Sequence, residues 1–263
     1  MNSKPIVLCF SGLDPTGGAG IQADIEAIAS QHCHATSVIT ALTVQDTHNV
    51  HHFECVDAQL LLRQARAVLN DMNVSAIKIG MLGSVAIAGA IHDLLTDHPH
   101  IPVIVDPILA AGGGGTLSTS HLMDAINHLI LPHTHIVTPN TLEAHKLTGC
   151  DITSDKSYVL EQLAKTGVKY ILLTGTHADT HDVQHHLYRG TTHLQTFTYQ
   201  RLPNEYHGSG CTLTASLAAL IAQETDIIDA AQQALDYSYN SLLHAHQLGK
   251  GQLIPDRFYW AST

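Results

Sequence analysis

The segment HGSGC, residues 207–211, joins two glycines to a cysteine just before an apolar helical pattern. Gly208 and Gly210 allow successive backbone N–H groups to converge, and a helix that begins there adds the positive end of its dipole. Such donors stabilise negative charge that develops during a reaction. The candidate catalytic residues are therefore Gly208, Ser209, Gly210 and Cys211. We expect the helix start to lower the pKa of the thiol, which could then act as a base or a nucleophile; a cysteine that only packs there is the alternative.

Carboxylates and an amide follow two other apolar runs. Asp106 ends VIVDP (103–107), and NTLE puts Asn140 and Glu143 three residues apart at the start of a predicted helix. Carboxylates at strand ends hold Mg²⁺, usually together with waters, and Mg²⁺ screens the charge of phosphates. Asp106 and Glu143 are therefore candidate metal ligands. Glu143 could instead be an acidic residue at a helix start that only interacts favourably with the positive end of the helix dipole.

Two more glycine-rich segments could approach a ligand. GAGIQA (18–23) matches the G-x-G-x-x-A pattern of dinucleotide-binding loops, but seven residues separate the preceding strand candidate from Gly18, whereas that motif turns directly from its strand. A longer loop around a small substrate, with Asp14 and Asp24 nearby, is favoured over a loop that only caps the next helix. AGGGG (111–115) has the glycines that close approach to a phosphate requires, and alone it decides nothing.

Composition limits the partners. Twelve Lys and Arg against 23 Asp and Glu give a formal net charge of −11, which argues against nucleic acid because phosphate backbones are bound mainly by basic side chains. The five cysteines are scattered and never spaced C-x-x-C, as in a reducing compartment. The 21 histidines lack the spacing of a zinc site, so we expect them on the surface. With no signal peptide and no long apolar run in view, we expect a cytoplasmic protein that does not bind membranes.

The elements that must position these residues alternate between strands and helices. Short runs that are apolar throughout predict strands at 6–10, 36–43, 75–80, 103–107, 135–139 and 170–175. Helical patterns cover about 19–31, 57–72, 84–97, 119–130, 141–148, 154–166, 211–223 and 226–247. This order predicts an α/β fold with a mostly parallel central sheet and helices on both faces. In such sheets ligands bind beyond the carboxyl ends of the strands, where the candidate residues fall.

One departure from this alternation precedes the last two helices. VQHHLYRG and THLQTFTYQ, joined at Gly190–Thr192, predict a hairpin at a sheet edge. No linker rich in Pro, Gly or Ser and no internal repeat interrupts the chain, so we expect one domain over residues 1–263.

Several of these motifs occur in an order that resembles a known family. SGLDPTGGAGIQADIEAIAS, SVITALTVQDT, KIGML, VDPILA, VTPNTLEAHKLTG and HGSGCTLTASLAAL are similar to segments of the hydroxymethylpyrimidine/phosphomethylpyrimidine kinases of thiamine biosynthesis, within the ribokinase-like superfamily. The resemblance runs from about residue 6 to 222. It implies a ribokinase-like fold and the phosphorylation of a small pyrimidine and of its monophosphate, with ATP and Mg²⁺ as cofactors and a homodimer as the default assembly.

The resemblance also implies roles for individual residues. Gln45 would hold the aminopyrimidine ring, because a carboxamide offers an acceptor beside its donors. Gly12, Ala19, Asp24 and Met81 would line the ring pocket. NTLE, through Asn140 and Glu143, would help to organise Mg²⁺ and phosphate, and Cys211 would be the base that most sugar kinases of the superfamily replace by Asp.

Two positions depart from the family pattern. Thr174, in TGTH, stands where the family usually has a lysine near the transferring phosphate, and a GGG segment replaces the usual SGD. These changes remove a cation and an acid from the phosphate end, and they leave the pyrimidine pocket untouched.

Three other functions compete with a pyrimidine kinase. A pyridoxal kinase would use the same scaffold. A cysteine-dependent acyl-transfer enzyme would need a histidine held against the thiol, for which His207 is in range but unmarked. A NAD-binding oxidoreductase is favoured by GAGIQA alone.

Overall fold

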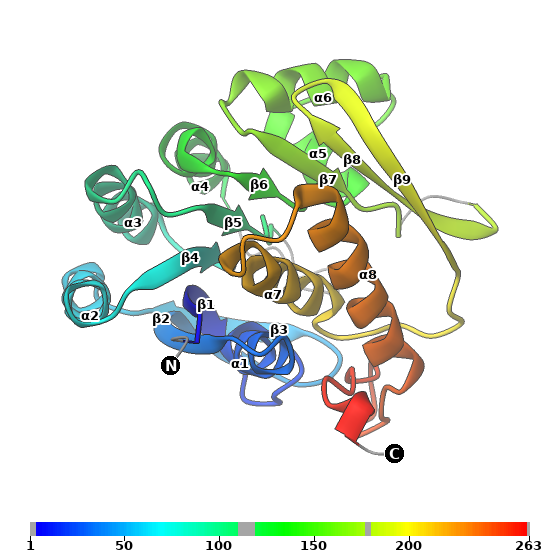
Figure 1. Cartoon of the computed structure of the whole chain (residues 1–263), viewed down its shortest axis with the longest axis horizontal. Helices are drawn as coiled ribbons and strands as arrows, with labels where there is room; N and C mark the ends of the chain where they lie inside the picture. Colours follow the sequence, from blue (N-terminus) through cyan, green and yellow to red (C-terminus); the bar gives the residue numbers. More distant parts are fainter. Residues whose placement is uncertain (1–3, 110–118, 177–179, 262–263) are drawn as a thin grey trace.

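The computed structural model describes residues 4–109, 119–176 and 180–261, and nine of its strands form one sheet (Figure 1). The strands are β1 (Ile6–Leu13), β2 (His34–Gln45), β3 (Val50–Cys55), β4 (Val74–Ile79), β5 (Val103–Val105), β6 (Ile136–Val137), β7 (Tyr170–Leu173), β8 (Asp182–Arg189) and β9 (Thr192–Gln200). Their spatial order is β3-β2-β1-β4-β5-β6-β7-β8-β9.

The central part of this sheet is parallel. The pairs β2–β1, β1–β4, β4–β5, β5–β6 and β6–β7 all run in the same direction. Antiparallel strands close both edges, β3 on one side and the hairpin β8–β9 on the other. The parallel core and the edge hairpin agree with the sequence prediction.

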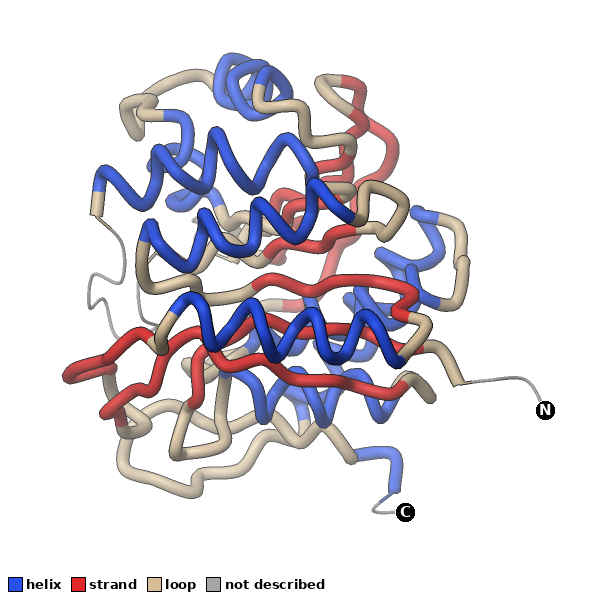
Figure 2. Tube along the Cα trace, turned by 90° about the vertical axis from the view of Figure 1, so that its left-hand side faces the viewer, coloured by secondary structure: helices blue, strands red, loops and turns tan. Residues whose placement is uncertain are grey.

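Helices cover both faces of the sheet (Figure 2). One face packs against α2 (Ala58–Asp71), α3 (Val85–Asp97), α4 (Ser120–Ala125), α5 (Thr141–Thr148) and α6 (Lys156–Lys165). The other face packs against α1 (Gly20–Ser30), α7 (Ser209–Ala222) and α8 (Ile227–Leu243). Strand β1 shows why both layers form: Leu8 and Phe10 enter the first core, while Val7 and Cys9 enter the second. Alternate side chains of a strand point to opposite faces, so an uninterrupted apolar run fills two cores.

Three sequence predictions differ from the structure in detail. Strand β3 was not predicted, because VHHFEC is mostly polar and exposed and pairs with only one neighbour. The helix expected over 119–130 is α4 followed by a π-helical turn at Ile126–Ile130. The last helix ends at Leu243 rather than 247, and the chain continues as an irregular tail. Within the described residues, no helix is both long and apolar enough to cross a membrane.

Candidate active site

The parallel strands bring nearly all the candidate residues to one edge of the sheet. Gly12, Gln45 and Met81 lie at or just beyond the carboxyl ends of β1, β2 and β4, which are adjacent; we call this group, with Ala19 and Asp24, the β2–β1–β4 side. Asp106, Asn140 and Thr174 follow β5, β6 and β7; with Glu143 they form the β5–β6–β7 side. The start of α7 packs against both groups, through Gly208 and Gly210.

Helix α7 begins at a left-handed residue. Gly208, its N-cap, has φ +78°, and a Cβ there would lie 2.0 Å from the carbonyl oxygen of Gly18 and 2.9 Å from the Cα of Ala19. Only glycine tolerates both the dihedral angle and the contact. The loop after β1 and the start of α7 are therefore in direct backbone contact, which brings Ala19 beside the HGSGC segment.

The thiol of Cys211 is buried in the first turn of α7. Burial raises its pKa to about 12, and the charges of Asp106 and Asp24 act in the same direction, whereas Lys78 and a hydrogen bond from the Gly20 N–H lower it less. The sequence-based expectation of a lowered pKa is wrong for this site. Desolvation of a thiolate among two carboxylates outweighs the helix dipole.

Asp106 lies directly below the start of α7. A Cβ on Gly210 would be 3.5 Å from its Oδ2 atom, and the neighbouring Cys211 side chain lowers the pKa of this carboxylate. Burial raises the pKa of Asp106 to about 6 against the lowering effect of Lys78. Among the described residues Oδ2 has no hydrogen-bond partner, although it is buried. A buried carboxylate oxygen without a partner is costly, so this atom is suited to a ligand or a cation.

A second buried acid, Asp24, forms an ion pair inside the protein. Its Oδ2 accepts hydrogen bonds from Ser11 Oγ at 2.6 Å and from Lys78 Nζ at 3.0 Å, and its Oδ1 lies 2.8 Å from Lys78 Nζ without accepting a hydrogen bond among the described residues. Burial alone would lower the pKa of Lys78, but Asp24, Cys211 and Asp106 outweigh it, and the pKa is raised. Lys78 is therefore a fixed cation beneath the candidate site. No local sequence pattern indicates this ion pair, since the two residues are 54 positions apart.

Asp14 and His207 form another buried pair, across the same backbone contact. His207 Nε2 lies 2.8 Å from Asp14 Oδ2, and Asp14 also accepts hydrogen bonds from the Thr16 and Ala19 N–H groups at 2.8 and 2.7 Å. Burial would raise the pKa of Asp14, but the bonds from His207 and Thr16 prevail and lower it to about 2. His207 thus bonds to Asp14, whereas the Cys211 side chain neighbours Asp106 and affects its pKa. This arrangement lacks the cysteine–histidine contact of an acyl-transfer enzyme.

Gln45 ends β2 at a pocket of about 420 Å³. Thr16 from the loop after β1 lines the same pocket, and Leu248 and Lys250 line it from the C-terminal tail. Gly12 and Met81 lie deeper: a Cβ on Gly12 would be 3.2 Å from the Met81 sulfur, so the glycine makes room for that side chain. The prediction that these residues share one pocket with Gln45 stays a prediction.

Asn140 and Glu143 form a capping box at the start of α5. The Asn140 side chain accepts the Glu143 N–H, and Glu143 Oε2 accepts the Asn140 N–H, both at 2.9 Å. Burial and the neighbouring Asp106 raise the pKa of Glu143 to about 8. Thr174 pairs with this turn, since its N–H donates to the Pro139 carbonyl at 2.9 Å. Glu143 therefore caps α5 and also lies near enough to Asp106 for the two carboxyl groups to affect each other.

The chemistry of this pair fits a divalent cation. Two carboxyl groups whose pKa values are both raised, one with an unpartnered oxygen, lie together with no basic side chain bonded to them among the described residues. The described residues contain no group of three His, Cys, Asp or Glu that could hold a metal alone. A magnesium ion here would therefore need waters and phosphate oxygens to complete its shell. The AGGGG loop and its GGG segment lie outside the described residues.

Comparison with known proteins first defines the class. The structure superposes on a pyridoxal kinase from Staphylococcus aureus in complex with AMP-PCP and pyridoxal, with a TM-score of 0.89 at 22% identity over 99% of this chain and 96% of that one. It also superposes on a phosphomethylpyrimidine kinase from Clostridium difficile, with a TM-score of 0.78 at 29% identity over 90% and 98% of the two chains. The fold is the predicted ribokinase-like fold.

Sequence comparison then gives the family. The phosphomethylpyrimidine kinase family model matches residues 14–256. A hydroxymethylpyrimidine/phosphomethylpyrimidine kinase from Haemophilus influenzae is 33% identical over 260 residues, which cover 95% of this chain and 96% of that protein. The chain belongs to the phosphomethylpyrimidine kinase family, a family of phosphotransferases.

Proposed function

We propose that this protein uses ATP to phosphorylate 4-amino-5-hydroxymethyl-2-methylpyrimidine and then its monophosphate, giving the diphosphate used in thiamine biosynthesis. The family match over residues 14–256 supports the substrate class. The observation that carries the proposal is the position of Cys211 in the first turn of α7. At this helix start, Gly208 packs against Gly18 and Ala19 of the loop after β1, and Gly210 lies against Asp106 of the β5–β6–β7 side.

In this proposal the β2–β1–β4 side binds the pyrimidine. Gln45 hydrogen-bonds to the amino group and its neighbouring ring nitrogen, while Gly12, Ala19 and Met81 contact the ring. Asp24 supports the pocket from beneath, because Lys78 and Ser11 already engage both of its oxygens. The pyrimidine would then sit above a neutralised ion pair instead of a bare carboxylate.

The β5–β6–β7 side would receive the nucleotide. Asn140 and Thr174 would contact its phosphates, and Asp106 and Glu143 would hold Mg²⁺ through their oxygens. Thr174 supplies no cation to this side of the site, so the ion would be needed to neutralise the phosphate charge. The N–H groups of Ser209 and Gly210 and the dipole of α7 would add fixed donors.

The chemistry then follows from the start of α7. A new bond forms between the hydroxyl oxygen of the pyrimidine and the γ-phosphorus, the bond from that phosphorus to the bridging oxygen of ATP breaks, and ADP leaves. The hydroxyl proton passes to Cys211, which acts as the base and never carries the phosphoryl group. Since the resting thiol is protonated at neutral pH, only the thiolate fraction would accept the proton, and Lys78 favours that form.

Incubation with ATP, Mg²⁺ and the hydroxymethylpyrimidine, followed by mass spectrometry of the products, tests the proposal. We expect one and then two phosphoryl groups on the pyrimidine. Pyridoxal is assayed in parallel, because a pyridoxal kinase shares the fold. If pyridoxal alone is phosphorylated, or neither compound gains a phosphoryl group, the proposed substrate is wrong.

We also infer a cytoplasmic homodimer. Leu42 and Val44 of β2 expose apolar side chains, at 48% and 58%, and a second copy could cover them. Light scattering after size-exclusion chromatography tests the assembly, and a monomeric mass would exclude it.

A further inference from the structure

The C-terminal tail reaches back into the candidate active site through one buried arginine. Arg257 is 1% exposed and is among the largest fully buried side chains. An arginine is rarely buried this completely unless its donors are used, because removing its charge from water is costly. Its N–H donors are therefore expected to hydrogen-bond to groups inside the protein.

The Arg257 guanidinium spans two segments of the candidate site. Its Nε donates to Thr212 Oγ1 at 2.9 Å, in the first turn of α7. Its Nη1 and Nη2 donate to the carbonyl oxygens of Gly17 and Gly18, in the loop after β1. Nη1 also lies 3.1 Å from Glu26 Oε2, which balances the charge. One planar group thus fixes the loop that carries Ala19 relative to the helix that carries Cys211.

The bond from Arg257 to the Gly18 carbonyl also fixes the position of the loop after β1. The Gly18 carbonyl that Arg257 holds is the atom against which Gly208 packs, and Thr212 Oγ1 donates at 2.8 Å to the Gly208 carbonyl. The bonds therefore run from the loop through Arg257 and Thr212 to the turn before Cys211. A guanidinium suits this task because its donors form a rigid, planar fork.

The tail is itself anchored on both sides. The Arg257 carbonyl accepts hydrogen bonds from Ser30 Oγ at 2.7 Å and from Tyr237 OH at 2.8 Å. Upstream, the Gln252 N–H donates to the Thr47 carbonyl at 2.9 Å, next to Gln45, and the Leu253 N–H donates to the Glu205 carbonyl at 3.0 Å.

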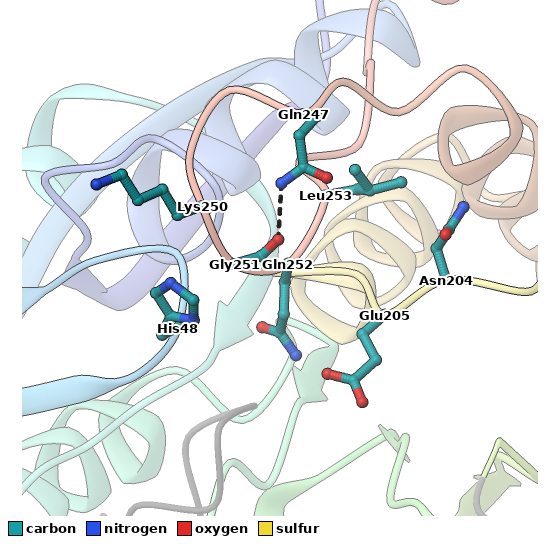
Figure 3. A pocket seen from close by; sticks show the side chains of 8 residues that line it. All are labelled: His48, Asn204, Glu205, Gln247, Lys250, Gly251, Gln252 and Leu253. Atoms are coloured by element: carbon teal, nitrogen blue, oxygen red, sulfur yellow. Dashed lines mark hydrogen bonds between the residues drawn. The ribbon is translucent and has the colours of Figure 1, made fainter.

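Figure 3 shows this part of the tail between the turn that carries His48 and the segment that carries Asn204 and Glu205. The dashed line in that view is the bond from Gln247 Nε2 to the Gly251 carbonyl, 2.8 Å long, which closes the tail loop on itself. The tail therefore joins the β2–β3 turn, the loop after β1 and the segment before α7, three parts of the chain that flank the β2–β1–β4 side.

We propose that Arg257 is a positioning residue of this active site: it holds the Gly17–Ala19 loop at the distance from Cys211 that the pyrimidine requires. The inference rests on the proposed function. Arg257 touches neither ligand in this account and acts through the two segments that it joins.

The test compares Arg257→Met, which keeps the apolar stem but removes every donor, with Arg63→Met, which removes an exposed arginine of α2 on the opposite face of the sheet. All assays run well below the thermal midpoint of each variant. We expect Arg257→Met to raise the KM for the pyrimidine about 10- to 100-fold, since several charge-assisted bonds are lost, while the KM for ATP changes by less than about twofold, a difference in the range of a surface substitution. Arg63→Met leaves both values unchanged.

A chemical rescue separates positioning from general stability. Arg257→Gly leaves space for a small ligand. We expect millimolar methylguanidinium to lower the raised KM for the pyrimidine part of the way to its native value, whereas methylammonium, which lacks the planar fork, should leave that KM unchanged. If Arg257→Met does not fold, Arg257→Lys supplies the same KM comparison, because it keeps the charge and loses the fork. A folded variant with native KM values, or an equal rise in both KM values, overturns the proposal.

Hydrogen–deuterium exchange distinguishes this failure from failure of the proposed function, because it needs no substrate. Faster exchange over residues 14–20 and 207–212 in Arg257→Met, with native exchange in Arg63→Met, supports the positioning role even if the native protein does not phosphorylate the pyrimidine. If the native protein phosphorylates the pyrimidine and exchange in Arg257→Met is unchanged, the positioning role of Arg257 is excluded and the proposed function stands.

Discussion

The two sides of the site handle buried charge in opposite ways. On the β2–β1–β4 side, Asp24 is paired with Lys78 and Ser11, and the neighbouring Asp14 is paired with His207 and backbone N–H groups. On the β5–β6–β7 side, the pKa values of Asp106 and Glu143 are raised to about 6 and about 8, and no cation bonds to them among the described residues. Each acid of the first side has a basic partner inside the protein, although Asp24 Oδ1 accepts no hydrogen bond, whereas neither acid of the second side has such a partner among the described residues.

This difference indicates which side is preformed. A buried network of ion pairs and hydrogen bonds holds one geometry, which suits recognition of a small rigid ring. Two carboxyl groups in mutual repulsion gain most when a cation arrives, which suits a magnesium nucleotide. Substitutions on each side, and at Cys211 between the two sides, test this division.

Replacing Cys211 has the largest expected effect. Cys211→Ala should lose roughly 10²- to 10⁴-fold in turnover, the range for loss of a general base, while both ligands still bind, since neither side loses its own contacts. Cys211→Asp should recover part of the rate. Steady-state kinetics with calorimetric binding measures both quantities, and Cys55→Ala, at an exposed cysteine, is the control. Native turnover in Cys211→Ala, or a phosphocysteine trapped in the native enzyme, would contradict the assignment.

Gln45→Ala tests the β2–β1–β4 side alone. We expect pyrimidine binding to weaken by about 1–3 kcal/mol, because a buried polar partner is left unpaired, and ATP binding to stay unchanged. Gln64→Ala, at an exposed position of α2, is the matched control. Calorimetric titration of each ligand gives the comparison, and equal losses for both would show that Gln45 only supports the fold.

Asp14→Asn tests whether that side is held by its internal pairs. The folded-state pKa of Asp14 is lowered to about 2, so its carboxylate stabilises the fold above the pKa of the unfolded chain, about 4, and this contribution disappears as the pH falls towards 2. We therefore expect Asp14→Asn to lower the free energy of unfolding by about 1–3 kcal/mol at pH 7 and by about half as much at pH 3, midway between the two pKa values. Urea unfolding at both values checks this, with exposed Asp71→Asn as the control. A loss independent of pH would argue against the pair.

Thr174→Lys should have the smallest effect and tests the β5–β6–β7 side. Supplying the missing cation should raise the rate of the second phosphorylation about two- to tenfold and reduce the Mg²⁺ concentration needed for half-maximal activity, as expected for an added charge close to phosphate. Initial rates across a Mg²⁺ series measure both. If nothing changes, another cation already serves this side; exposed Lys146 is the residue to test by Lys146→Gln, since Lys78 is occupied by Asp24.

Much of this arrangement could be predicted from the sequence, because it follows from local patterns. Apolar runs located the six parallel strands, and a parallel sheet brings the ends of its strands to one edge. Strand β3 was missed because its polar, exposed residues carry no apolar pattern. The pKa of Cys211 was predicted in the wrong direction because the helix start is visible in the sequence, whereas the burial of the thiol beside Asp24 and Asp106 is not.

The pairs that hold the site together could not be found in this way. Arg257 and Gly18 are 239 residues apart, and Asp14 and His207 are 193 apart. No local periodicity records such contacts, and an arginine near the end of a chain predicts nothing by itself. Only the tertiary fold shows that a residue of the tail and a loop after the first strand share one hydrogen-bond network.

The pH dependence of kcat/KM for the pyrimidine tests the central claim most directly, because that claim makes the thiolate form of a buried, mostly protonated cysteine the base between the two sides. Burial raises the pKa of Cys211 to about 12, so the thiolate fraction grows about tenfold per pH unit in the range below it. For the native enzyme we predict kcat/KM to rise with a slope near one in log units between about pH 7.5 and 9.5. In Cys211→Asp, where the carboxylate is already ionised, that component of the slope should vanish, and Glu143, present in both enzymes, cancels from the comparison. The same slope in both enzymes, or a flat profile in the native one, would contradict the account.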